Sequence, residues 1–170
     1  MLYVFQSVYL ANHPEGVLPA LWPDEAVYAF YIFLAVAYCI AYWVFDEANY
    51  QKNLYRQNER GHAIKRNLFP TFRALGPKPF VIKGKEGTLL ADGWWGKARK
   101  IHYAADITQS LIWGLSCGFG SFRPYFYCCF FMGMLMHRTL RDEERLAEKY
   151  GDVWVKYKAH VPHRFIPGLF

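Results

Sequence analysis

The first 51 residues of this 170-residue chain contain no lysine and no arginine. No Arg-rich transit peptide opens the chain, and no positively charged segment follows Met1 as in a secretory signal. The four cysteines (Cys39, Cys117, Cys128 and Cys129) lie in apolar runs without paired spacing, which indicates buried, reduced thiols. His160 and His163 lack cysteine or carboxylate partners at ligand spacing, so no metal site is predicted.

The basic residues that the first segment lacks are concentrated in the next one. Residues 1–51 hold five acidic residues, whereas residues 52–100 hold twelve lysines and arginines against three acids. A basic block that follows an acidic, apolar one is typical of a chain with an anionic partner or with a membrane orientation signal. Nucleic acid is a poor candidate for that partner, because an apolar run of membrane length adjoins the basic block.

That apolar run is "AVYAFYIFLAVAYCIAYWVF", from Ala26 to Phe45, which has no charge over twenty residues. This is about the length that crosses ~30 Å of hydrocarbon. Tyrosine and tryptophan crowd its ends, as they do at membrane interfaces. We predict a membrane-spanning helix, with residues 52–100 on the cytosolic side; a buried core helix is the alternative.

The remaining segments predict further helices and one loop. Tyr3 to Leu10 reads as the end of an earlier membrane helix. Residues 66–90 are broken by proline and glycine, which indicates a loop with room for one short strand. Two shorter apolar runs, split by Gly120–Pro124, predict two helices that are partly re-entrant or packed on other helices. "HRTLRDEERLAEKYGDVWVKY", residues 137–157, predicts a short charged helix and then an aromatic-rich turn.

The charges of this last segment are ordered. Arg138, Asp142, Arg145 and Lys149 recur at i, i+4, i+7 and i+11, which places them in one stripe of a helix. The stripe is either a salt-bridged face in solvent or an anion clamp, because arginine suits bidentate contacts with phosphate. Upstream, Lys52 and Arg56 lie four residues apart, as interfacial anchors or as a second phosphate grip.

The segment "LLADGWWGKARKIHYAAD", residues 89–106, combines unusual residue types. Two tryptophans lie between Gly93 and Gly96, and a basic run, His102, Tyr103 and Asp106 follow. Glycine lets a backbone approach a ligand closely, and an indole offers a flat surface to a ring. A ligand site and an interfacial aromatic anchor both remain open.

These stretches, with "RPYFYCCFF" and "WVKYKAHVPHRFIPGLF", resemble the C-terminal portion of the sterol reductases. That family includes the C14, C7 and C24(28) reductases and the lamin B receptor. The resemblance covers residues 49–170 and, more loosely, the chain from Met1. Within the family the chain looks most similar to the fungal-type Δ24(24¹)-sterol C24 reductases.

The resemblance implies an all-α, polytopic membrane helix bundle of the endoplasmic reticulum, in which cytosolic loops form an NADPH pocket. The chain corresponds to the C-terminal half of a ten-helix fold. Residues 1–48 would be membrane helices and residues 49–105 a basic cytosolic loop. Residues 106–137 would be membrane or re-entrant helices, and residues 138–170 a cytosolic helix and tail.

The resemblance also implies which residues bind the cofactor: Lys52, Arg56, Leu90, Trp95, His102, Tyr103, Arg138, Asp142, Leu146, Lys149, Tyr150 and Tyr157. The activity implied is the NADPH-dependent reduction of a sterol double bond, at C24(28) in the side chain. Because an unconjugated alkene is not electrophilic, we expect an acid to protonate it before hydride is transferred. The acid is unassigned, with Tyr103 and Asp106 as candidates for the proton relay.

The expected partners are a sterol, the lipid bilayer and the missing N-terminal half of the fold. The chain resembles a fragment, a truncated gene model or a degenerate copy, for which we expect no sterol turnover in isolation. Two alternatives remain. One is a methyltransferase of the isoprenylcysteine carboxyl type that uses S-adenosylmethionine, although such enzymes lack the "GWWG" loop. The other is a non-catalytic membrane protein like the lamin B receptor.

Overall fold

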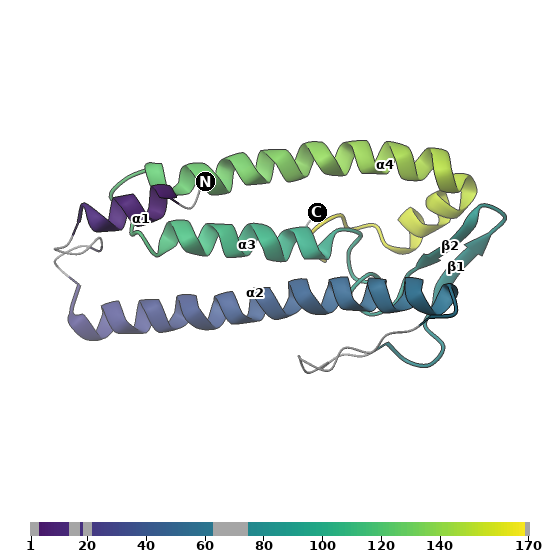
Figure 1. Ribbon diagram of the computed structural model, residues 1–170, viewed down its shortest axis with the longest axis horizontal. Helices are drawn as coiled ribbons and strands as arrows, with labels where there is room; N and C mark the ends of the chain where they lie inside the picture. Colours follow the sequence, from purple (N-terminus) through teal and green to yellow (C-terminus); the bar gives the residue numbers. More distant parts are fainter. Residues whose placement is uncertain (1–3, 14–17, 19–21, 63–74, 169–170) are drawn as a thin grey trace. The chain divides into compact units, whose positions relative to one another are not determined.

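The computed structural model describes residues 4–13, 18, 22–62 and 75–168 (Figure 1). Most of them are helical: α1 is Val4–Ala11, α2 is Asp24–Glu59, α3 is Ile101–Leu115 and α4 is Phe126–His160. Strands β1 (Val81–Gly84) and β2 (Gly87–Leu90) form a small sheet, and Arg123–Tyr125 form a 3-10 turn. The chain divides into two compact units, Met1–Tyr42 with Ala105–Met136 (the first unit) and Trp43–Ala104 with His137–Phe170 (the second unit).

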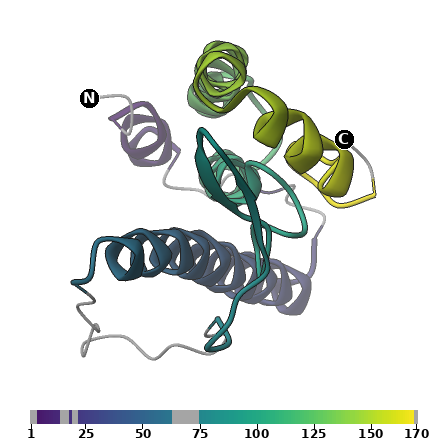
Figure 2. The same cartoon turned by 90° about the vertical axis from the view of Figure 1, so that its right-hand side faces the viewer.

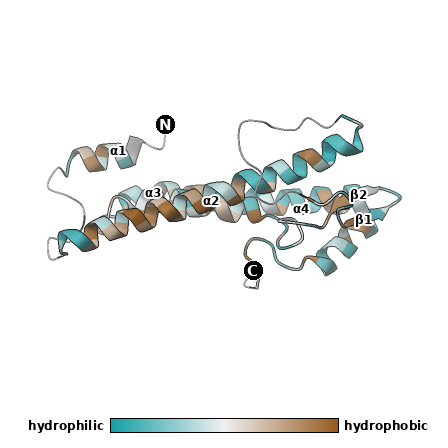
Figure 3. Cartoon of the chain, turned by 90° about the horizontal axis from the view of Figure 1, so that it is seen from below, coloured by the Kyte–Doolittle hydropathy of each residue, from teal (hydrophilic) through white to brown (hydrophobic). Residues whose placement is uncertain are grey.

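Helix α2 contains the predicted membrane segment. In the described part of the chain it alone is long and apolar enough to cross a membrane. Asp24 and Glu25 occupy its first turn, where acidic groups favour the positive end of the helix dipole. Hydrophobic residues dominate its earlier turns, and polar residues take over toward its end (Figure 3).

The same helix continues beyond the predicted boundary at residue 48. Residues 49–59, expected to be loop, are helical because they contain neither proline nor glycine. The helix ends just before Gly61, whose φ of 78° lies in the left-handed region that favours glycine. Lys52 and Arg56 therefore lie on a rigid helix.

The first unit holds α1, the first part of α2, most of α3 and the start of α4. The predicted break at Gly120–Pro124 is present, between the end of α3 and the 3-10 turn that leads into α4. The Gln6 amide donates to the Pro124 carbonyl at 3.0 Å, and the Tyr125 hydroxyl donates to the Gly118 carbonyl at 2.9 Å. With 15 residues, α3 is shorter than the ~20 that a full span requires.

The four cysteines are not all buried, as the sequence had suggested. Cys117 and Cys128 are buried, but Cys39 and Cys129 are exposed. The exposed pair lies on the apolar helices α2 and α4, on faces that no described residue covers. An apolar sequence environment thus predicted the wrong burial for two thiols, because helix faces, not sequence neighbours, determine burial.

The chain is mostly helical, as expected, but the second unit adds a two-stranded sheet to the helices. Strands β1 and β2 pair antiparallel, with Val81 opposite Leu90 and Gly84 opposite Gly87. Gly87, with a φ of 134°, allows the tight connection between them. The predicted loop of residues 66–90 is therefore a hairpin over residues 81–90; its residues 66–74 lie outside the described part, as do Met1 to Tyr3.

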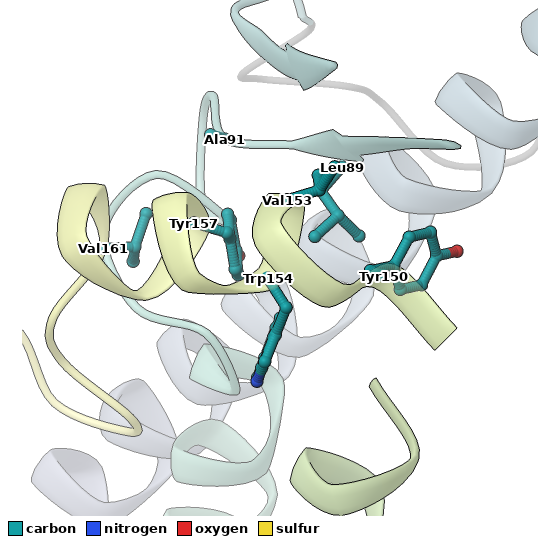
Figure 4. Packing of buried hydrophobic residues seen from close by; sticks show 7 residues of the cluster. All are labelled: Leu89, Ala91, Tyr150, Val153, Trp154, Tyr157 and Val161. Atoms are coloured by element: carbon teal, nitrogen blue, oxygen red, sulfur yellow. The ribbon is translucent and has the colours of Figure 1, made fainter. Parts of the chain in front are cut away.

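Helix α4 changes direction at Gly151, where φ is 44° and ψ is −119° (Figure 2). The residues after Gly151 are helical to His160, so the predicted aromatic-rich turn is wrong. After the break, Val153 faces Leu89 of β2, and Trp154 and Tyr157 belong to the same buried cluster (Figure 4). The cluster consists of Leu89, Ala91, Tyr150, Val153, Trp154, Tyr157 and Val161.

We expect Gly151→Ala to lower the free energy of unfolding by about 1–2 kcal/mol, because a Cβ is strained in this backbone conformation. Gly133→Ala is the control on the same helix: a Cβ there meets nothing within 4 Å. That change should stabilise the protein by ~0.5–1 kcal/mol. Denaturant unfolding in detergent micelles measures both variants. If both changed the free energy of unfolding in the same direction, the argument from backbone conformation would be contradicted.

A cation-lined cavity in the second unit

A cavity of about 80 Å³ lies in the second unit, between α2, the hairpin, residues 91–100 and α4. It combines basic side chains with aromatic and aliphatic ones. Its lining residues are Lys52, Tyr55, Arg56, Leu89, Leu90, Trp95, Arg99, Lys100, Leu146, Trp154 and Tyr157. A cavity of this size accommodates one ring or one charged group of a larger ligand.

Trp95 forms one wall of the cavity and is held by two helices. Its indole N–H donates to the Ala48 carbonyl of α2 at 2.8 Å. Its own carbonyl accepts the Tyr157 hydroxyl proton at 3.0 Å. Burial raises the pKa of Tyr157, so its hydroxyl stays protonated and keeps donating. The indole is therefore a fixed surface.

The turn that carries Trp95 is stabilised by two side-chain acceptors. The Asp92 carboxylate accepts the backbone N–H of Phe80 at 3.0 Å and that of Gly93 at 2.6 Å. Gln51, which is 1% exposed, accepts the Trp94 N–H at 3.0 Å. At Gly93 φ is 60°, and a Cβ there would collide with Gln51. The "GWWG" motif thus requires its first glycine for both backbone conformation and space.

Lys52 places a positive charge on the Trp95 surface. Its ammonium lies 4.3 Å from the ring centroid, within cation–π range. Partial burial, together with the charges of Lys100 and Arg56, lowers the pKa of Lys52 to about 8. Such a lowered pKa indicates a region in which an additional negative charge would be stabilised.

Arg56 is oriented by a network at the end of α2. It donates to Glu59 at 2.9 Å and to the Tyr150 hydroxyl at 3.2 Å. Glu59 also accepts from Tyr55, at 2.8 Å, and from Thr88 of the hairpin. The guanidinium is thus held at the cavity by both α4 and the hairpin.

Asp142 is paired within the second unit. Its carboxylate accepts from the Lys100 ammonium at 2.7 Å. Desolvation opposes ionisation, but this bond and the charges of Lys100 and Arg138 outweigh it and lower the pKa of Asp142. The carboxylate is therefore ionised at neutral pH, and it orients the Lys100 ammonium.

His102 and Tyr103 continue the aromatic surface at the start of α3. The His102 ring lies 5.0 Å from the Trp95 ring and 4.3 Å from that of Tyr103. Burial and the charges of Lys52, Lys100 and Arg138 lower the pKa of His102 to about 3. The imidazole is neutral at physiological pH and therefore holds no acidic proton there.

Most of the predicted site residues lie at or next to this cavity. Lys52, Arg56, Leu90, Trp95, Leu146 and Tyr157 line it. His102 contacts Trp95, Tyr150 contacts Arg56 and Asp142 contacts Lys100. Tyr103 lies beside Lys100 and Arg138, and Lys149 lies over the Tyr150 ring.

Two residues of the predicted constellations lie elsewhere. Asp106 belongs to the first unit, on α3, and is half-buried. Arg145 is exposed, although it shares the charged stripe of α4. The stripe therefore combines both readings that we considered, since Asp142 takes part in the cavity's charge network whereas Arg145 faces solvent.

Sequence reasoning missed five of the residues that line the cavity: Tyr55, Leu89, Arg99, Lys100 and Trp154. Tyr55 follows Lys52 by three residues, a spacing that places both on one helical face. Trp154 lies three residues before Tyr157, but we had interpreted that segment as a turn. In the sequence, Arg99 and Lys100 belong to a run of basic residues, and nothing in that run indicated which of them would line a cavity.

The arrangement suits an anion that carries an aromatic ring. Four cations (Lys52, Arg56, Lys100 and Arg138) are close enough to influence one another. Two acids contact members of this set directly: Asp142 binds Lys100 and Glu59 binds Arg56. Charge-assisted bonds from lysine and arginine are strong phosphate contacts, and the Trp95 face offers a stacking surface.

A comparison with known protein families shows to which family the chain belongs. The model of the ergosterol biosynthesis ERG4/ERG24 family matches residues 1–170. The chain belongs to this family. It is therefore a sterol reductase homologue by descent, and the membership accounts for the sterol-reductase motifs in its sequence.

Individual relatives agree with this membership. The chain is 42% identical to a Delta(24(24(1)))-sterol reductase of Gibberella zeae, over 97% of this chain and 27% of the relative. It is 40% identical to the Delta(24(24(1)))-sterol reductase erg4A of Aspergillus fumigatus, over 100% and 35%. It is 35% identical to the Delta(14)-sterol reductase LBR of Gallus gallus, over 97% and 23%. The chain thus spans about a third or less of the length of these relatives.

Proposed function

We propose that this chain forms the NADPH-binding part of a sterol reductase that reduces a C=C double bond, at C24(28) of the sterol side chain. The observation that carries the proposal is the cavity, which Lys52 and Arg56 of α2 and the basic pair 99–100 line together with the Trp95 indole, with Lys52 lying on the indole face. The relatives that are 42% and 40% identical to this chain are both Delta(24(24(1)))-sterol reductases, which supports the choice of double bond.

The residues of the cavity fit this cofactor. NADPH carries phosphate groups and two aromatic rings, and when bound it supplies the hydride. Lys52 and Arg56 would hold phosphate oxygens, because both project from the end of α2 into the cavity. Trp95 would support a ring, with Leu90 and Leu146 as apolar neighbours and Tyr157 behind the indole. His102, Tyr103, Arg138, Asp142, Lys149 and Tyr150 would complete the site around it.

The reaction also needs a proton for the alkene carbon that receives no hydride. His102 does not supply it near neutral pH, since its pKa is about 3. The Tyr157 proton is committed to the Trp95 carbonyl. Tyr103, beside Lys100 and Arg138, and Asp106 of the first unit are the two alternative candidates for the residue that relays the proton.

The placement in the cell is part of the proposal. Helix α2 would cross the endoplasmic reticulum membrane as one of several spans, with the basic residues 49–105 and the segment 138–170 in the cytosol. The sterol, the bilayer and an N-terminal half of the fold would be the partners. We expect no sterol turnover by the 170-residue chain alone.

Calorimetric titration of the purified chain in lipid nanodiscs tests the proposal. We expect saturable binding of NADPH and none of S-adenosylmethionine. Binding of S-adenosylmethionine alone would favour the methyltransferase alternative. Binding of neither would favour a non-catalytic membrane protein. Reduction of a sterol by the isolated chain would contradict our expectation about turnover.

The affinity for NADPH should fall as the pH rises through about 8, because Lys52 then loses its charge. The 2′-phosphate is fully ionised above about pH 7, so it does not mask this change. Lys52→Arg is the matched control, since arginine keeps its charge and should abolish the decline. Titration calorimetry across this range provides the measurement.

The stability of the free protein should respond with the opposite sign. The pKa of Lys52 is about 8 in the folded chain and 10.5 without the fold, so the unfolded chain binds more protons between those values. The contribution of Lys52 to the free energy of unfolding therefore rises with pH in that window.

For the binding prediction, an NADPH affinity that does not change with pH in the natural chain would exclude Lys52 from the phosphate site.

A further inference from the structure

Arg99 lines the cavity, yet its side chain is directed to the C-terminal end of the chain. It is 7% exposed. One terminal nitrogen donates to the carbonyls of Val161 and Pro162, both at 2.7 Å, and the other donates to Glu143 at 3.2 Å. These bonds use three of its five N–H groups, so most of the guanidinium is engaged with the protein itself.

The backbone continues the same connection. The Arg99 N–H donates to the His163 carbonyl at 3.0 Å, and the Lys100 N–H donates to the Arg164 carbonyl at 2.7 Å. We call residues 161–165 the C-terminal strap. Because Arg99 and Lys100 bond to four successive strap carbonyls, from Val161 to Arg164, the strap and residues 99–100 form one unit.

Glu143 connects this unit to α4. One of its oxygens accepts from Arg99 and the other from Arg164, each at 3.2 Å. The residue before it, Asp142, accepts from the Lys100 ammonium at 2.7 Å. Two adjacent acids of α4 therefore bind two adjacent basic residues. Asp142 binds Lys100, and Glu143 binds Arg99.

These contacts fix the position of Lys100. Its backbone is fixed by the strap and its ammonium by Asp142, and it lines the cavity beside Lys52. Lys100 is 8% exposed, so its charge is directed into the protein and not into solvent. Because lysine is long and flexible, such a fixed position requires support from neighbouring groups.

We propose that Lys100 is a further cofactor-binding cation and that Arg99 is the residue that positions it, by fastening the C-terminal strap beneath it. The inference rests on the proposed NADPH site and extends it to the last residues of the chain. A ligand phosphate would reach Lys100 from the cavity, while Asp142 and the strap hold the lysine from behind.

Four variants of the 170-residue chain test the proposal: Arg99→Lys, Lys100→Met, the double variant and the control Arg145→Lys. The control makes the same chemical change at an exposed arginine. NADPH affinity is measured by calorimetry in nanodiscs. We expect each cavity variant to weaken binding roughly tenfold, the cost of one charge-assisted hydrogen bond.

The double variant separates positioning from a general loss of structure. If Arg99 acts through Lys100, the double variant should bind about as weakly as Lys100→Met alone, roughly tenfold below the natural chain. An additive loss of roughly a hundredfold would mean that Arg99 acts independently, which overturns the positioning role. Natural affinity in Arg99→Lys or in Lys100→Met would overturn it as well.

Hydrogen exchange of the cofactor-free chain provides a readout that does not depend on NADPH. Arg99→Lys should speed exchange at the Lys100 amide and in the strap, whereas Arg145→Lys should leave both unchanged. Unchanged exchange in Arg99→Lys would overturn the inference even if NADPH binds. Faster exchange in a chain that binds no NADPH would refute the proposed function and the role of Lys100, and would leave only a structural strap.

Discussion

Replacing Lys52 with methionine is expected to weaken NADPH binding by tenfold to a hundredfold, the equivalent of about 1.5–3 kcal/mol for a charged hydrogen bond. Lys52 is the cation that lies directly on the Trp95 surface, 4.3 Å from the ring centroid. Methionine keeps much of the length and the apolar contact, but it removes the charge and all three donors. Calorimetric titration at neutral pH and constant salt measures the loss.

Lys97→Met is the matched control for this variant. Lys97 belongs to the same basic region and also lies over an indole, 4.6 Å from the Trp94 ring, but it is exposed and does not line the cavity. We expect its loss to change the affinity by less than about twofold, as for most exposed charges. Equal effects of the two variants would mean that only net charge matters, and would argue against a phosphate site at Lys52.

The second large effect concerns stability. Trp154→Ala should lower the free energy of unfolding by about 3–5 kcal/mol, the usual cost of truncating a buried aromatic residue. Trp154 is 3% exposed and stacks on Tyr157, with ring centroids 5.5 Å apart. It also lines the cavity, so its removal should loosen the wall that Tyr157 supports.

Its chain neighbour offers the control. Val155 is 60% exposed, and Val155→Ala should change the free energy of unfolding by no more than about 0.5 kcal/mol. Denaturant unfolding of the cofactor-free protein in micelles measures both variants. If the two were equally destabilising, Trp154 would not be buried in the cluster that Figure 4 shows.

The sequence predicted the helices and their breaks where the signals are local. The uncharged run Ala26–Phe45 is helical because no residue within it interrupts the helix, and glycine and proline separate α3 from α4. The same reasoning failed at Gly151. A single glycine there redirects the helix without ending it, and only packing on β2 shows that residues 152–160 remain helical.

The hairpin shows a related limit. The sequence allowed one strand in residues 66–90, but a strand is stable only with a partner. Val81 and Leu90 pair directly, and Tyr150 and Val153 of α4 lie against the hairpin, at Gly87 and Gly84. That pairing depends on residues some sixty positions later in the chain, which no local pattern contains.

For the candidate site, the sequence by itself determined which chemistry is present: basic residues, tryptophans between glycines, and an ordered stripe of charge. Only the tertiary structure decided which of these residues meet. Asp142 lies beside Lys100, and Arg99 is occupied by the C-terminal strap while Lys52 lies on Trp95. These contacts join residues about 40 to 60 positions apart, and the physical reason is that burial and charge pairing in three dimensions, not helical spacing, select the partners.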